Sequence, residues 1–200
     1  MVKSMNNPAV GMIYIKDNKI SETYRDIVKQ SWLNAGYKIW FHEAITPETL
    51  DQGVKQLNFG KKASGRRKGQ ELSPTEKAIW YSHMMMWEIA SRKQNPLIVI
   101  EHDVMLLQHI DHALMSKPIV GLSHCGLLSK HPHKGYRISA GGAYLLTPEM
   151  GKKLIDNLPK EVTYNSDGYI HNFIARYGEF RHHHSTQLYL PELGATIDHG

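Results

Sequence analysis

The sequence PLIVIEHD, residues 96–103, places an unbroken run of four apolar side chains directly before Glu101, His102 and Asp103. A short run of branched apolar residues bounded by a proline is typical of a strand buried on both faces, as in the centre of a parallel sheet. Ligands of such sheets bind beyond the carboxyl ends of the strands. We therefore expect Leu97–Ile100 near the centre of a sheet, with the two acids at its ligand-binding edge.

The clearest helix start in the chain precedes this strand. Ser73-Pro74-Thr75-Glu76 fits a capping box, in which the Ser73 hydroxyl accepts from the Glu76 N–H and the Glu76 carboxylate accepts from the Ser73 N–H. Pro74 occupies the first helical position, where no N–H is needed. The pattern predicts a well-buried helix that runs to about Arg92 and is rich in aromatic and methionine residues.

Strands and helices alternate on both sides of this unit. Short apolar runs predict further strands at residues 12–15, 39–41, 119–122 and 143–146. Residues suited to helix caps precede three more segments with helical spacing: Ser21, Thr147 and Ser166. Gly36 would end the first of these helices. The alternation predicts the α/β class, as one domain over residues 1–200 with a mostly parallel twisted sheet and helices on both faces.

The composition limits the classes of protein to consider. The chain is 41% hydrophobic and 22% charged, which is ordinary for a globular domain. Its single cysteine, Cys125, excludes an internal disulfide and a Cys-based zinc cluster. No run approaches the roughly 18 apolar residues that span a bilayer, and the N-terminus lacks the apolar core of a signal peptide. We expect a cytoplasmic protein without a transmembrane segment, for which peripheral contact with a membrane stays open.

Much of the formal net charge of +5 lies in one glycine-containing stretch, formed by Lys61, Lys62, Arg66, Arg67 and Lys68. Such a stretch attracts polyanions, among them nucleic acid, phosphorylated glycolipid and nucleotide diphosphate. A solvated surface loop explains the same residues equally well. Aromatic residues that could stack on bases are not interleaved with the basic ones, which disfavours nucleic acid as a partner.

Glu101 and Asp103 are candidate metal ligands. Alternate residues of an extended segment point the same way, so both carboxylates can face one ion. Oxygen ligands with room for phosphates suit Mg²⁺ or Mn²⁺, and such an ion can neutralise a departing nucleotide diphosphate. An acid-X-acid pair is a weak motif by itself. The competing interpretation is a pair of solvated acids at a strand end.

The order of these motifs resembles glycosyltransferase family 25, of the lipopolysaccharide-biosynthesis type. Residues 72–76 are similar to the family's Leu-Thr-Pro-Gly-Glu stretch, and the helix with Ser82, His83 and Trp87 is followed, as in the family, by a strand that ends in acids. Residues 141–146 are similar to its Gly-Thr-Gly-Ala-Tyr-Leu-Ile stretch, and Asn165-Ser166-Asp167 stands where the family has Pro-X-Asp. The resemblance runs from about residue 12 to residue 197.

This resemblance implies a GT-A-like nucleotide-binding domain. It implies metal-assisted, inverting transfer of a hexose, such as galactose, from a UDP-sugar to a glycan or lipopolysaccharide acceptor, with Mn²⁺ or Mg²⁺ held by Glu101 and Asp103. It places Asp167 as the general base, because inversion requires a group that takes the acceptor's proton. The nucleotide-sugar contacts that it implies are Tyr14, Lys16, Ser82, His83 and His102.

Two departures from the family pattern keep other functions open. His102 occupies the position of the middle acid, and Tyr14 replaces an asparagine of the first strand. One alternative is a catalytically degenerate module of the same fold that binds glycan or a polyanion, and another is a transferase acting on modified DNA. Two candidate residues also have purely structural interpretations, His83 as a hydrogen-bonded core histidine and Asp167 as a carboxylate favoured at a helix start.

Overall fold

The computed structural model describes residues 7–56, 66–67, 70–124, 142–158, 166–180 and 186–188. Six strands form one sheet in the order β10-β7-β9-β5-β1-β2. Their bounds in chain order are β1 Ala9–Tyr14, β2 Ile39–Glu43, β5 Leu97–Glu101, β7 Ile119–Gly121, β9 Ala143–Leu146 and β10 Glu179–Phe180. A smaller sheet contains β6 Val104–Leu106, β8 Ser123–His124 and β11 Thr186–Leu188.

The main sheet is mixed, with one reversed strand. Strand β1 pairs in parallel with both β2 and β5, and β10 pairs in parallel with β7. Strand β9 is antiparallel to its two neighbours, β5 and β7. The four residues Leu97–Ile100 are fully buried in the interior strand β5. The expected α/β class and the central position of this strand are confirmed, while the reversal of β9 was not expected.

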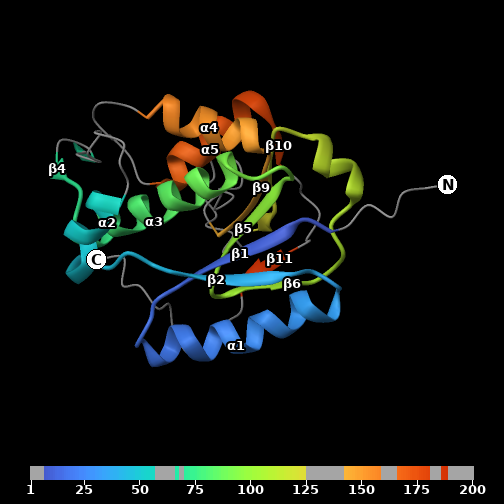
Figure 1. The fold of residues 1–200 in the computed structure, drawn as a ribbon, viewed down its shortest axis with the longest axis horizontal. Coiled ribbons are helices and arrows are strands. Elements are labelled where there is room, and N and C mark those ends of the chain that lie inside the picture. Colours follow the sequence, from blue (N-terminus) through green and yellow to red (C-terminus); the bar gives the residue numbers. More distant parts are fainter. Residues whose placement is uncertain are drawn as a thin grey trace, which may run out of the picture.

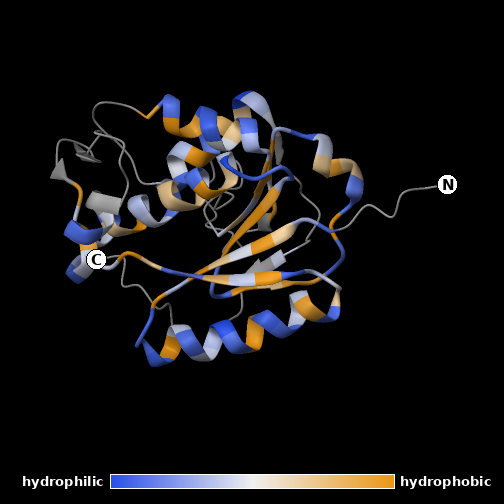
Figure 2. Ribbon diagram, viewed as in Figure 1, coloured by the Kyte–Doolittle hydropathy of each residue, from blue (hydrophilic) through white to orange (hydrophobic). Residues whose placement is uncertain are grey.

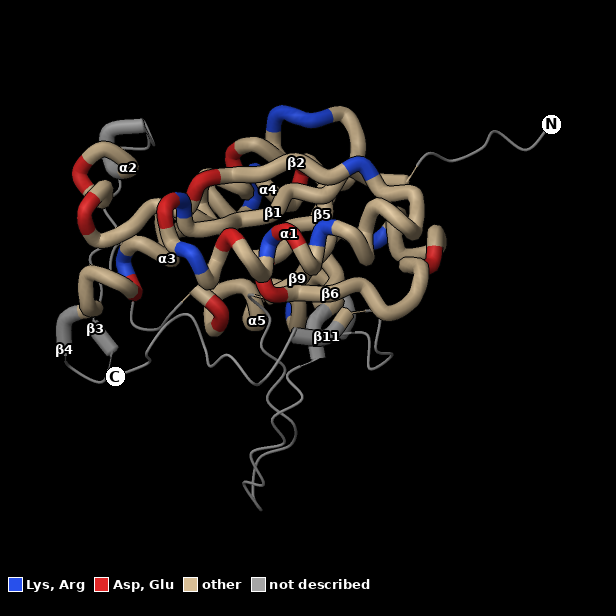
Figure 3. The backbone as a smooth tube through the Cα atoms, turned by 90° about the horizontal axis from the view of Figure 1, so that it is seen from below, with Lys and Arg blue, Asp and Glu red and all other residues tan. Residues whose placement is uncertain are grey.

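Helices cover both faces of this sheet (Figure 1). Helix α1 (Lys19–Asn34) lies on one face, and α3 (Pro74–Ser91), α4 (Pro148–Asp156) and α5 (Ser166–Tyr177) lie on the other. Side chains of β5 alternate between the two cores, with Leu97 and Val99 on the α3 face and Ile98 and Ile100 on the α1 face. The strands are accordingly apolar along most of their length (Figure 2), and the outer side of α1 carries charges of both signs (Figure 3).

The capping box of α3 forms as the sequence predicts. The Ser73 N–H donates to Glu76 Oε2 over 2.9 Å, and the Glu76 N–H donates to Ser73 Oγ over 3.2 Å. The predicted cap of α1 is wrong, because Asn18 holds that position and its side chain accepts from the Ser21 N–H. Ser21 Oγ instead accepts from the Ile15 N–H over 2.9 Å and fixes the chain between β1 and α1.

The remaining elements are short, and they contribute to both cores, with Leu50 packed against the core of the α3 face and Leu114 in the core of the α1 face. They are α2 Leu50–Gln56, the short strands β3 Arg66–Arg67 and β4 Gln70–Glu71, and the 3₁₀ helices η1 Pro47–Thr49 and η2 His112–Ser116. Strands β3 and β4 pair antiparallel where the sequence suggested a loop. Lys61, Lys62 and Lys68 of the basic stretch, together with Cys125, lie outside the described residues. Among the helices of the described ranges, none combines the length and apolar character needed to cross a bilayer.

Candidate active site

The candidate site lies at the carboxyl ends of β1 and β5. Ile13 is the register partner of Glu101, so β1 and β5 end side by side at one edge of the sheet. Strand β5 ends at Glu101, and His102 and Asp103 form a turn that leads into β6. The prediction that the two carboxylates point the same way assumed that residues 101–103 are extended, and the turn shows that they are not. The proximity of the two carboxylates depends on the turn instead.

Glu101 and Asp103 nevertheless act on each other. Burial raises the pKa of the Asp103 carboxyl to about 7, and the nearby Glu101 carboxylate adds to the rise. Asp103 Oδ1 is enclosed and has no hydrogen-bond partner among the described residues. A buried carboxylate oxygen without a donor is rare and suits a site for a cation or a bound water. The chemistry of this pair therefore fits a divalent cation.

A cation at this position would need further ligands. In the described part of the chain, no group of three or more His, Cys, Asp or Glu side chains is arranged to hold a metal ion. Mg²⁺ and similar hard cations are commonly held by one or two carboxylates together with waters and substrate phosphates. Glu101 and Asp103 would supply the two carboxylates of such a site, and waters and substrate phosphates would complete the coordination.

A buried chain of polar side chains leads to Glu101 from the core. Trp87 Nε1 donates to the Tyr144 hydroxyl over 2.9 Å, and that hydroxyl lies 3.0 Å from His83 Nδ1. His83 Nε2 lies 3.4 Å from Glu101 Oε1, at the long end of the hydrogen-bond range. His83 is 1% exposed, and Trp87 and Tyr144 are fully buried. His83 therefore contacts Glu101, one of the two candidate metal ligands, and its predicted contact with the nucleotide sugar stays a prediction.

Asp167 lies on the same side of the sheet, in the first turn of α5. Burial raises the pKa of the Tyr144 hydroxyl well above its usual value, and the negative charges of Glu101 and Asp167 add to this effect. Both carboxylates therefore lie close enough to Tyr144 to act on it electrostatically. His83, Glu101 and Asp167 thus all lie near Tyr144 on this side of the sheet, and their roles as metal and base residues stay predictions.

Tyr14 and His102 belong to the opposite face. The Arg25 guanidinium of α1 lies 4.8 Å from the centre of the Tyr14 ring. The His102 ring stacks on Tyr24 of α1 with centroids 6.2 Å apart, and its residue is only 6% exposed. Burial lowers the pKa of His102. Neither side chain faces the His83 cluster, although both lie at the same edge of the sheet.

Lys16 and Ser82 are also separated from that cluster. Lys16 Nζ lies 3.3 Å from Glu43 Oε1 in an exposed ion pair at the end of β2. The buried Ser82 hydroxyl donates to the Ala78 carbonyl over 2.9 Å and accepts from the Ile45 N–H over 2.9 Å. These bonds hold α3 against the segment after β2. For both residues, contact with a nucleotide sugar stays a prediction.

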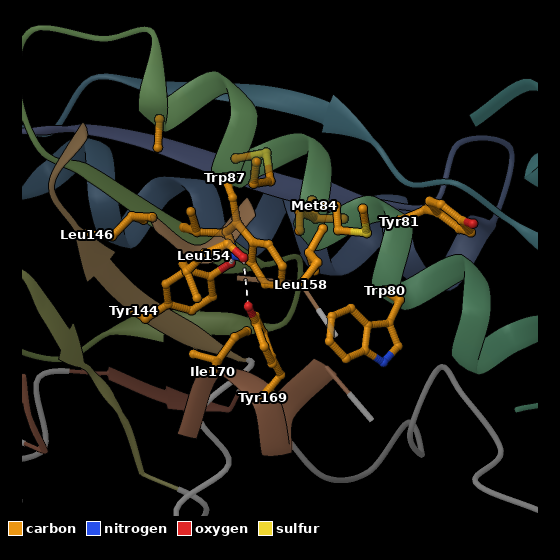
Figure 4. Packing of buried hydrophobic residues seen from close by; sticks show 14 of the residues in the cluster. Trp80, Tyr81, Met84, Trp87, Tyr144, Leu146, Leu154, Leu158, Tyr169 and Ile170 are labelled. Atoms are coloured by element: carbon orange, nitrogen blue, oxygen red, sulfur yellow. Dashed lines mark hydrogen bonds between the residues drawn. The ribbon is translucent and has the colours of Figure 1, made fainter. Parts of the chain in front are cut away.

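Tyr144 and Trp87 were not singled out as site residues by the sequence, although both lie in motifs of the family pattern. Their rings pack with Trp80, Tyr169 and Leu154 in the core between the sheet and α3 (Figure 4). A buried tyrosine hydroxyl or indole N–H usually requires a hydrogen-bond partner. A tyrosine within the apolar strand 143–146 is the feature that could have directed attention to this position.

The model of glycosyltransferase family 25 (LPS biosynthesis protein) matches residues 12–121, which include His83, Glu101 and Asp103. A glycosyltransferase involved in the glycosylation of the major capsid of PBCV-1 is similar in structure, with a TM-score of 0.47, 12% identity and coverage of 86% of this chain and 80% of that one. Mouse xyloside xylosyltransferase 1, in its apo form, has a TM-score of 0.42 and 13% identity, covering 89% of this chain and 78% of that one. No curated protein sequence matches this chain.

Proposed function

The chain belongs to glycosyltransferase family 25 (LPS biosynthesis protein), and on that basis we propose that it transfers a hexose, such as galactose, from a UDP-sugar to a glycan or lipopolysaccharide acceptor. Membership makes the chain a glycosyltransferase. What we propose beyond this is the hexose, the nucleotide, the acceptor, the metal and inversion at the anomeric centre.

The enclosed Asp103 Oδ1 beside Glu101 is the observation that carries the metal-assisted form of this reaction. We assign Glu101 and Asp103 as the residues that hold Mn²⁺ or Mg²⁺. When bound, the cation supplies positive charge that neutralises the diphosphate leaving group. The two carboxylates are available for this because Glu101 ends the interior strand β5 and Asp103 lies in the next turn, at the edge where sheets of this kind bind ligands.

Asp167 is the proposed general base. An inverting transfer needs a group that removes the proton from the acceptor hydroxyl as that oxygen attacks the sugar. Asp167 lies on the α3 face with His83 and Glu101, and its charge acts on the Tyr144 hydroxyl. Donor and acceptor would then meet on this face of the sheet edge. Lys16 would contact the nucleotide from beyond the end of β1, and Tyr14 would contact it from the α1 face.

The surroundings of His102 favour an active enzyme over a degenerate binding module. His102 is buried against Tyr24 of α1, whereas His83 approaches Glu101 from α3 on the other face. Replacing an acid by histidine at position 102 therefore does not remove a carboxylate from the His83 side of the site. The pair Glu101 and Asp103 is retained.

A thermal-shift screen of UDP-hexoses, UDP and unrelated nucleotides, each with and without Mn²⁺, tests this function. A ligand at 100 times its dissociation constant stabilises the folded protein by about 2.7 kcal/mol, so binding raises the melting temperature measurably. We expect a Mn²⁺-dependent rise with one UDP-hexose. Stabilisation by glycans or DNA, with none by any nucleotide sugar, would instead support one of the two alternatives.

A further inference from the structure

The hydrogen bonds between Trp87 and Glu101 run in one direction. An indole N–H is only a donor, so the Tyr144 oxygen accepts from Trp87 over 2.9 Å. The single hydroxyl hydrogen of Tyr144 is then free to point at His83 Nδ1, 3.0 Å away. An ionised Glu101 carboxylate can only accept, so its bond to His83 requires a hydrogen on Nε2. A neutral imidazole with hydrogen on Nε2 has its lone pair on Nδ1, where Tyr144 donates.

From this order we infer that Trp87, Tyr144 and His83 form a relay that orients the Glu101 carboxylate for metal binding, with Tyr144 as the positioning residue that selects the His83 tautomer. The inference rests on the proposed function in one respect, namely that Glu101 is a metal ligand. Groups that hydrogen-bond to metal ligands orient those ligands and influence metal affinity.

The fold holds each member of this relay in place. His83 and Trp87 are four residues apart on α3 and therefore share one face of the helix. Tyr144 is paired with Val99 across the β5–β9 ladder, on the face where Glu101 meets His83. The reversed strand β9 thus supplies the hydroxyl that joins His83 to Trp87, and His83 contacts Glu101 at the sheet edge.

The relay leads from the buried core to the partly exposed Glu101 at the edge of the sheet. Trp87, Tyr144 and His83 are between 0% and 1% exposed, so water does not replace a lost partner. The Glu101 side chain, in contrast, is 33% exposed and remains accessible to a ligand. A tyrosine that only completes the core would need one hydrogen-bond partner, whereas this hydroxyl contacts two side chains of α3, one of which contacts Glu101 at the end of β5.

The test measures Mn²⁺ binding in the presence of UDP, from the electron paramagnetic resonance of free Mn²⁺. Loss of an outer-shell partner typically weakens metal binding about 10- to 100-fold, so we expect a dissociation constant at least roughly tenfold higher for Tyr144→Phe and for His83→Leu. Tyr37→Phe is the matched control. It removes a hydroxyl of another core tyrosine, which accepts from the Ile110 N–H on the α1 face, and it should leave Mn²⁺ affinity unchanged.

A conservative variant separates orientation from simple loss of packing. In His83→Gln, the side-chain amide supplies a donor near the position of Nε2, so we expect Mn²⁺ affinity within about threefold of the wild type against the 10- to 100-fold loss typical of a missing partner. Affinity as low as that of His83→Leu would overturn the inference. So would wild-type affinity in both Tyr144→Phe and His83→Leu.

Glu101→Gln distinguishes failure of the relay from failure of the proposed function. If Mn²⁺ binds equally well to this variant, Glu101 is not a ligand and the proposed metal site is wrong. If the variant loses Mn²⁺ while Tyr144→Phe and His83→Leu keep it, only the relay is wrong.

Nuclear magnetic resonance of ¹⁵N-histidine-labelled protein supplies a readout that needs neither metal nor activity. The His83 signals are assigned by their loss in His83→Gln. We expect the neutral ring with its hydrogen on Nε2 in the wild type. A hydrogen on Nδ1 of the neutral ring would contradict the direction of the relay.

Discussion

The Ser82 hydroxyl accepts a 2.9 Å hydrogen bond from the Ile45 N–H and thereby joins the middle of α3 to the segment that follows β2. Ser82 precedes His83, so this bond also holds the turn of α3 that presents His83 to Glu101. The same hydroxyl donates its hydrogen to the Ala78 carbonyl. Both of its hydrogen-bonding functions are used within the protein, which favours a structural role for Ser82.

Ser82→Ala should therefore destabilise the fold without a specific loss of nucleotide binding. The variant leaves the buried Ile45 N–H without its acceptor, which costs about 1–3 kcal/mol. Urea denaturation measures the free energy of unfolding, and titration calorimetry measures UDP affinity with Mn²⁺ present. A stable variant that has lost UDP affinity would instead show that Ser82 contacts the nucleotide.

Asp103 gives the metal-free protein a distinctive dependence on pH. The pKa of its carboxyl is about 7 in the folded state, against about 4 in an unfolded chain. The folded state therefore binds the extra proton, and the contribution of Asp103 to stability is full below about pH 4 and is lost as pH rises through about 7. Asp103→Asn removes this loss because its amide stays neutral.

We accordingly expect metal-free Asp103→Asn to melt at a higher temperature than the wild type at pH 8, and the difference to shrink toward pH 5. Each kcal/mol of relieved cost corresponds to about 2–4 °C in a domain of this size. Calorimetric melting in the presence of a chelator measures the difference. Equal melting temperatures across the range would show that the ionised Asp103 carboxylate does not destabilise the metal-free protein.

His102→Asp tests whether position 102 contributes to the metal site. The His102 side chain is buried against Tyr24, so a carboxylate there would lie in a poorly solvated position on the α1 face. We expect a lower melting temperature and no gain in Mn²⁺ affinity, because burying an unpaired charge is costly. A variant that binds Mn²⁺ more tightly would place this position among the ligands and would support a protein that has drifted from the family chemistry.

Asp167→Asn tests the general base. Loss of a general base typically slows the chemical step about 10²- to 10⁴-fold, whereas loss of a favourable carboxylate at a helix start costs only about 0.3–1 kcal/mol of stability. The variant should remain folded, bind the nucleotide sugar normally and transfer at least about a hundredfold more slowly. Near-normal turnover in single-turnover transfer assays, with a lowered melting temperature, would assign Asp167 to the helix terminus alone.

The sequence predicted those parts of the fold that depend on neighbouring residues. The capping box at Ser73 and the apolar run Leu97–Ile100 are local features, and both form as expected. The order of these and the other motifs along the chain was also sufficient to recognise the resemblance to glycosyltransferase family 25. The cap at Ser21 was misplaced because Asn18, three residues earlier, is an equally suitable cap.

The parts that could not be predicted depend on residues far apart in the sequence. The direction of β9 is set by its pairing with both β5 and β7, which no local pattern encodes. The contact between Tyr144 and His83 spans 61 positions of the chain. The turn at His102 and Asp103 likewise follows from the departure of β6 toward the smaller sheet. The candidate residues were therefore identifiable, but their partners were not.

The central claim is that Asp103, with Glu101, holds the divalent cation that binds the nucleotide diphosphate. Titration calorimetry of UDP into the wild type, Asp103→Asn and Asp156→Asn, each with and without Mn²⁺, tests it most directly. Asp156→Asn is the matched control, because it removes an exposed carboxylate that is paired with Lys152 on α4. We predict that Mn²⁺ strengthens UDP binding at least roughly tenfold in the wild type and the control, about 1.4 kcal/mol or more, and has no effect in Asp103→Asn. An undiminished effect of Mn²⁺ on UDP binding to Asp103→Asn would contradict the claim.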